Sequence, residues 1–93
     1  MTEPLEALRL QFIDRCRADR ERLAAPEADD AERAMIVHRL AGAAGAFGYP
    51  ELGAVAADLD VRIRSGAEVF PAHFEPLNLA LSDAIGRDAL RDG

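Results

Sequence analysis

The chain has 93 residues, which is enough for one domain with a single hydrophobic core and no stabilising cross-links. Hydrophobic residues make up 49% of it and charged residues 30%, and the net charge of −6 argues against a nucleic-acid partner because phosphate binding requires a basic surface. The only cysteine, Cys16, excludes an internal disulfide and fits a reducing compartment. No apolar run approaches the roughly 20 residues that are needed to span a bilayer. We therefore expect one cytoplasmic domain over residues 1–93, with a protein partner and no membrane attachment.

The first predicted helix runs from about Pro4 to Ala25. Pro4 stands near the first helical position, which favours proline, and Pro26 ends the helix. Its apolar residues recur at helical spacing and are expected to face the core. They are Leu5, Leu8, Phe12, Cys16 and Leu23.

The second predicted helix starts near Asp29 and continues to about Phe47. The Asp29 carboxylate can cap the helix, and Glu32 three residues later completes a capping-box pattern. Gly48 supplies the C-terminal stop. At about 100° per residue, the apolar residues of this helix fall within one arc of core-facing width. They are Ile36, Val37, Leu40, Ala43, Ala44 and Phe47.

Two more helices complete the prediction. The third runs from about Pro50 to Ser65 and ends at Gly66, and the fourth begins around Pro71 and is expected to fray toward Gly86. Short connections of about two to six residues favour antiparallel neighbours, and no alternating pattern predicts a strand. The sequence therefore predicts an all-α protein, an antiparallel up-and-down four-helix bundle. The apolar stripes are Leu52, Val55, Ala56, Leu59 and Ile63 in the third helix, and Phe74, Leu77, Leu81, Ala84 and Ile85 in the fourth.

The outer face of the second helix carries the most informative residue, His38. It points roughly 160° away from the centre of the apolar arc. Gly42 follows one turn later and has no side chain that could cover the imidazole, and Gly45 also adds no side chain on this face. A glycine inside a helix costs about 1 kcal/mol in stability relative to alanine, so two of them need a reason. We interpret the open space that Gly42 and Gly45 leave on this face as access for another protein to His38. Met35, one turn before the histidine, is interpreted as part of the docking surface.

The run H-R-L-A-G-A-A-G-A-F-G-Y-P-E-L, from His38 to Leu52, resembles the signature of histidine-containing phosphotransfer (HPt) domains. The resemblance implies that His38 accepts the phosphoryl group, that Leu40 is the buried leucine, and that Gly48 is the terminating glycine. One position departs from the family. Its usual lysine, three residues after the histidine, is Ala41 here, and all eleven basic residues are arginines. What that lysine does for the phosphoryl group is therefore either absent or supplied by another side chain such as Arg39.

The resemblance also implies a function. The protein would accept a phosphoryl group on His38 from an aspartyl phosphate of a response-regulator receiver domain and pass it to another receiver, with a hybrid histidine kinase as a further partner. The spacing of Gly42, Gly45 and Gly48 inside a helix does not match a nucleotide-binding fingerprint, so no kinase or ATP site is expected. We expect the protein to need no cofactor or metal of its own, because Mg²⁺ would belong to the partner receiver. We also expect it to be a monomer.

Several alternatives stay open at this point. Gly42 and Gly45 could serve close helix packing, Met35 could be an ordinary surface residue, and Arg39 could be a solvated arginine. Arg62 and Arg64 on the third helix are equally undecided between phosphate binding and solvation.

The whole domain could also be an adaptor that binds receiver or kinase domains without carrying phosphate, or a helical adaptor unrelated to signalling. His73 is interpreted as a surface residue, and the acidic residues near Asp29 are explained by the helix dipole, so no metal site is expected.

Overall fold

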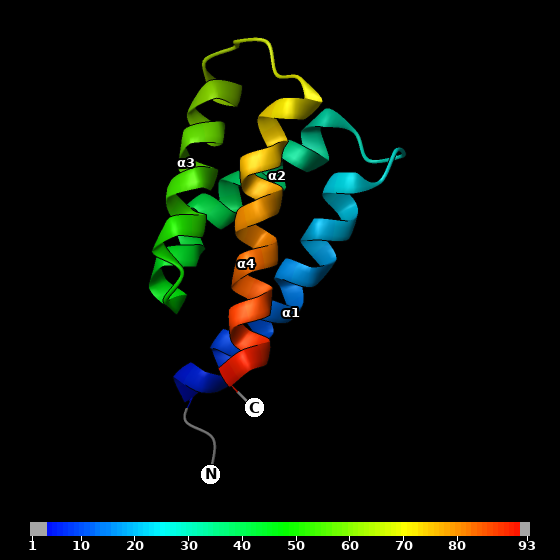
Figure 1. The fold of residues 1–93 in the computed structure, drawn as a ribbon. Coiled ribbons are helices and arrows are strands. Elements are labelled where there is room, and N and C mark those ends of the chain that lie inside the picture. The colour runs from blue at the N-terminus through cyan, green and yellow to red at the C-terminus, as the bar shows by residue number, and fades with distance from the viewer. Residues whose placement is uncertain (1–3, 92–93) are drawn as a thin grey trace.

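In a computed structural model, residues 4–91 are described, so residues 1–3 and 92–93 of the expected domain lie outside the described residues. Within residues 4–91 the chain is helical and has no strand, which confirms the predicted all-α four-helix fold (Figure 1). Two short 3-10 helices complete the elements. The helices are α1 (Pro4–Ala24), α2 (Asp30–Ala43), η1 (Ala44–Phe47), α3 (Pro50–Arg64), η2 (Pro71–Phe74) and α4 (Glu75–Arg91).

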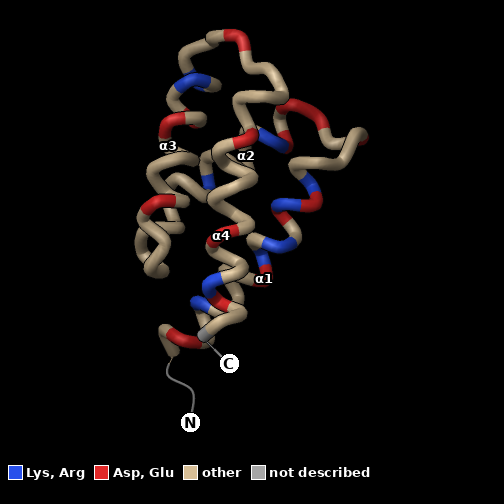
Figure 2. Tube along the Cα trace, viewed as in Figure 1, with Lys and Arg blue, Asp and Glu red and all other residues tan. Residues whose placement is uncertain are grey.

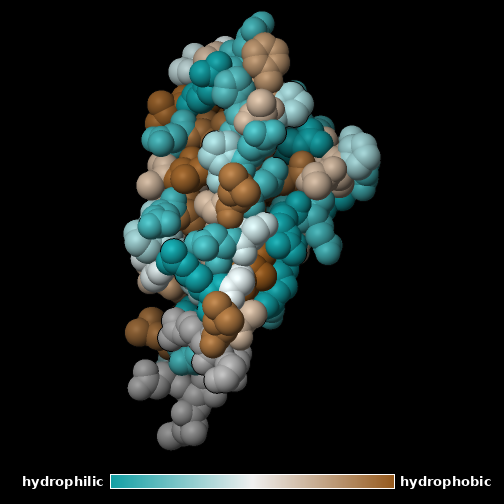
Figure 3. Space-filling view, viewed as in Figure 1, coloured by the Kyte–Doolittle hydropathy of each residue, from teal (hydrophilic) through white to brown (hydrophobic). Residues whose placement is uncertain are grey.

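The four long helices form a ring in which each packs against two neighbours: α1 and α3 each contact α2 and α4. Their inward faces supply one hydrophobic core. On the outside, in the view of Figure 3, hydrophobic side chains reach the surface as separate patches among hydrophilic ones. The fully buried large side chains are Ile13, Cys16, Val37, Leu40, Leu77 and Leu81.

The N-terminal turns of α1 extend past the connection between α2 and α3. That connection meets α1 at Phe12, whose ring stacks on Phe47 with centroids 5.0 Å apart. Leu5, predicted to face the core, is 71% exposed, and Leu8 is exposed as well, because only α4 accompanies this part of α1. The predicted stripe was therefore wrong at both leucines.

Instead of leucines, the first turns of α1 bury a charged group. Arg9 forms a buried ion pair with Asp88 of α4, and Ile13 one turn later is fully buried although the predicted stripe omitted it. This pair also explains why α4 continues as a regular helix past Gly86 to Arg91, where fraying was expected.

The caps at the two ends of α2 and η1 follow the sequence closely, with one difference. Asp29 Oδ1 accepts a hydrogen bond from the Glu32 backbone N–H at 2.8 Å, as predicted. The Glu32 carboxylate does not complete the capping box but binds Arg22 of α1 at 2.7 Å. Gly48 has φ +92°, the left-handed conformation that favours glycine after a helix.

The α-helical part of α2 stops at Ala43, and the next turn tightens into η1. A close approach of α3 accompanies this change, because a Cβ added at Gly53 would lie 3.3 Å from the Gly45 backbone nitrogen. Gly53 thus allows α3 to pack directly on the backbone of η1. Close helix packing was one of the roles that the sequence left open for Gly42 and Gly45. In the structure it occurs at the Gly45 backbone.

Candidate phosphate-accepting histidine site

His38 lies in the middle of α2 and faces outward, with 67% of its side chain exposed. The neighbouring side chains Ile36, Val37 and Leu40 are buried on the opposite face of the helix. A Cβ added at Gly42 would meet no atom within 4 Å, so the space above the imidazole is open. An approaching group can therefore reach the ring.

The imidazole is held on one side by a carboxylate from α3. His38 Nδ1 lies 3.2 Å from Asp60 Oδ2, and Asp60 is only 9% exposed because the bundle covers it. An ionised carboxylate can only accept, so we assign the ring proton to Nδ1. The lone pair of the neutral ring is then on Nε2, the other ring nitrogen.

Sequence reasoning missed Asp60. The available signal was its position one turn after Ala56 and next to Leu59, since a charged residue at the edge of an apolar stripe is unusual. That signal marks a buried carboxylate, but it does not tell which residue of another helix the carboxylate meets.

A second charged group reaches the same carboxylate. Arg64 stands one turn after Asp60 on α3, and its Nη1 lies 3.9 Å from Asp60 Oδ2, the oxygen that faces His38. Its side chain is 69% exposed. An imidazole, a carboxylate and a guanidinium thus meet on the surface shared by α2 and α3.

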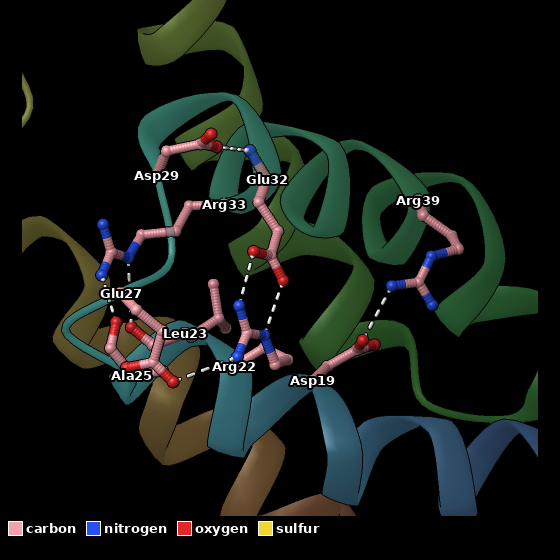
Figure 4. Close-up of polar contacts among 9 residues, drawn as sticks. All are labelled: Asp19, Arg22, Leu23, Ala25, Glu27, Asp29, Glu32, Arg33 and Arg39. Carbon is pink, nitrogen blue, oxygen red and sulfur yellow. Dashed lines mark hydrogen bonds and ion pairs between the residues drawn. The ribbon is translucent and has the colours of Figure 1, made fainter.

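Arg39, the arginine that sequence analysis offered in place of the family's lysine, is directed elsewhere. Its Nη2 donates to Asp19 Oδ1 of α1 at 2.7 Å, and Asp19 is buried (Figure 4). The structure therefore does not bring Arg39 together with the imidazole of His38; the contact joins α2 to α1.

The remaining predicted docking residues lie on the open face. Met35, one turn before His38, is exposed, and no atom lies within 4 Å of a Cβ added at Gly45. On α3, Val61 is exposed next to Asp60, an apolar contribution that sequence analysis did not single out. Each of the two helices thus exposes an apolar side chain, one turn before His38 on α2 and next to Asp60 in sequence on α3.

Other candidate chemistry does not gather in the described part of the chain. His73 Nδ1 accepts a hydrogen bond from the Phe70 backbone N–H at 2.8 Å and so caps η2. Within residues 4–91 no group of three or more His, Cys, Asp or Glu side chains is placed to hold a metal ion. No helix among the described residues is long and apolar enough to cross a membrane.

Comparison with known proteins identifies the family. Neither the curated proteins nor the solved structures give a match. The sequence model of the Hpt domain matches residues 7–88, which include all four long helices in whole or in large part as well as His38, Asp60 and Arg64. The chain therefore belongs to the Hpt domain family, the histidine phosphotransfer domains of phosphorelays.

Proposed function

We propose that His38 accepts a phosphoryl group from the aspartyl phosphate of a response-regulator receiver domain and passes it to a second receiver. The observation that supports this most strongly is the state of the imidazole. Its Nδ1 is engaged by Asp60 at 3.2 Å while the ring stays exposed, which leaves Nε2 as the nucleophile.

The transfer needs little from this chain beyond a positioned nucleophile. The Nε2 lone pair attacks phosphorus, the bond between phosphorus and the aspartyl oxygen breaks, and the receiver carboxylate leaves with the bonding electrons. Positive charge develops on the ring as the new P–N bond forms. Asp60 stabilises that charge through the Nδ1 proton, so it acts as a positioning residue. The reverse step returns the phosphoryl group to another receiver.

The metal in this reaction would belong to the partner. Phosphoryl transfer depends on in-line placement and on neutralising the charge of the equatorial oxygens, and a receiver can supply Mg²⁺ for that purpose. The open space above His38 at Gly42 and the exposed Met35 suit the approach of such a pocket. We propose a hybrid histidine kinase as a further partner on the same surface.

The test is transfer from receiver domains of the source organism, each phosphorylated with radiolabelled acetyl phosphate and freed of that donor. We expect label on this protein that is stable in base and labile in acid, as a phosphohistidine is, and its loss in His38→Gln. His73→Gln is the matched control and should keep the label, because His73 caps η2 and does not face His38. Failure of the wild-type protein to take label from any receiver would contradict the proposal.

An adaptor that binds receivers without carrying phosphate is the second candidate. Ala41 favours it, because it replaces the family's lysine with a side chain that carries no charge, while Arg39 is bound to Asp19. Receivers that bind wild type and His38→Gln equally well, with no label transferred, would support this function instead.

A further inference from the structure

A phosphoryl group on His38 would bring almost two negative charges to this surface and would need a cation nearby. Four arginines lie on α2 and α3, the two helices that flank the site, and three of them are already bound elsewhere. Arg33 donates to the backbone oxygens of Leu23 and Ala25 at 3.3 and 2.7 Å, Arg39 binds Asp19 at 2.7 Å, and Arg62 donates to the backbone oxygen of Glu68 at 2.8 Å. Figure 4 shows that Arg33 and Arg39 both point toward α1.

Arg64 is the arginine of these four that is held loosely and close to the histidine. Its distance of 3.9 Å from Asp60 Oδ2 is longer than a direct hydrogen bond, and most of its side chain is exposed. The same oxygen is 3.2 Å from His38 Nδ1, so the guanidinium and the imidazole share one carboxylate oxygen. An exposed ion pair of this length contributes little free energy, so little is lost if the guanidinium takes another partner.

We propose that Arg64 is the cation that binds the phosphoryl group on His38, and that it leaves Asp60 to do so. This inference rests on the proposed function, since it requires His38 to carry the group. A phosphoryl group carries more charge than one carboxylate and offers oxygens that a planar guanidinium contacts in pairs. Asp60, released from Arg64, keeps its hydrogen bond with Nδ1. The charge that the family draws from a lysine on the histidine's own helix thus comes from the next helix.

The experiment uses phosphoramidate as the donor, so that no receiver takes part. In this reaction the Nε2–P bond forms, the P–N bond of phosphoramidate breaks, and ammonia leaves. The rate of phosphohistidine formation and its half-life are followed by ³¹P NMR for the whole protein. We expect Arg64→Gln to lower the rate by about tenfold, the scale of one lost charge-assisted hydrogen bond. Arg64→Lys should keep most of the rate because it keeps the charge.

Arg62→Gln is the matched control, since it removes one arginine from the same helix at a side chain that is bound to the Glu68 backbone. It should leave the rate of phosphorylation unchanged. Arg64→Gln should also melt at the wild-type temperature, because the lost side chain is mostly exposed. A loss of rate without a loss of stability, rescued by lysine, is not what a structural role would produce.

Equal rates in wild type and Arg64→Gln would overturn the proposal, as would an equal loss in Arg62→Gln. Wild-type protein that takes no phosphoryl group from phosphoramidate would overturn it too. Wild-type protein that is labelled by phosphoramidate but exchanges with no receiver would refute the proposed relay alone, and the comparison of Arg64 variants would still decide this inference.

Discussion

One oxygen of the Asp60 carboxylate lies close to both His38 and Arg64, and the carboxylate is buried on α3. Two properties of this group matter: it accepts the Nδ1–H, and it carries a negative charge. An amide of the same size keeps the first property and loses the second, whereas alanine loses both. Substitutions at Asp60 therefore separate orientation of the ring from stabilisation of its charge.

We expect Asp60→Ala to slow phosphorylation of His38 about tenfold or more, and Asp60→Asn to slow it less because its amide oxygen still accepts from Nδ1. The rates are measured with phosphoramidate, and circular dichroism checks that each variant is folded. Asp58→Asn is the control, since Asp58 is an exposed acid on the same helix. If the alanine and asparagine variants react at the same rate, the hydrogen bond does not orient the ring.

The sequence predicted the exposed position of His38 because that position depends only on periodicity within one helix. It did not predict that Asp60 contacts the ring or that Arg64 reaches the same carboxylate, since the position of Asp60 against His38 depends on how α3 is rotated and shifted against α2. Arg39 illustrates the same limit: adjacency in sequence suggested a role beside His38, but its direction leads to Asp19 on α1.

At the scale of the helices, the boundaries follow local signals. Pro26, the Asp29 cap and Gly48 each stop or start a helix within about one residue of the predicted position, because caps and turns act over a few residues. The change from α2 to η1 was not predictable in this way. It coincides with the close contact between Gly53 and the Gly45 backbone, which joins residues on different helices.

The N-terminal cap of α2 gives a prediction of stability. Asp29→Ala removes the acceptor of the Glu32 N–H and should lower the free energy of unfolding by about 0.5–2 kcal/mol, measured by urea denaturation. Asp30→Ala removes the same charge one residue later, where the side chain is exposed and caps nothing, and should cost less. Equal losses would mean that the helix dipole, and not the capping hydrogen bond, accounts for the effect of Asp29.

At the scale of the whole molecule, the core combines residues from all four long helices, and the order of the helices was predictable from their short connections. The exposure of Leu5 and Leu8 was not, because it follows from unequal helix lengths: α1 has 21 residues and α2 has 14. Figure 2 shows that charged residues of both signs occur along α1 and α4. The Arg9–Asp88 pair joins the N-terminal part of α1 to the C-terminal part of α4.

The buried thiol of Cys16 links the stability of the whole bundle to pH. Burial raises its pKa from an ordinary 9.0 to about 12, and the nearby Asp19 carboxylate adds to the shift. Above pH 9 the thiol ionises in the unfolded chain while it stays protonated in the folded one, so the unfolded state binds fewer protons and the free energy of unfolding falls as pH rises toward 12.

We therefore expect the melting temperature to fall more steeply above pH 9 in the wild-type protein than in Cys16→Ala, measured by circular dichroism. Both proteins contain Tyr49, so the difference between the two curves isolates the thiol. Parallel curves from pH 8 to pH 11 would show that the folded protein does not hold this thiol protonated.

Tyr49 itself has a use that follows from its place in the fold. The chain contains one tyrosine and no tryptophan, so its intrinsic fluorescence comes from a single ring. That ring is buried and stacks on Phe12 with centroids 6.0 Å apart, at the joint where α1 meets the link between α2 and α3. After the receiver's own emission is subtracted, the tyrosine emission of the unlabelled protein therefore reports whether this joint opens when a receiver docks. A signal that stays constant during docking would indicate a rigid scaffold.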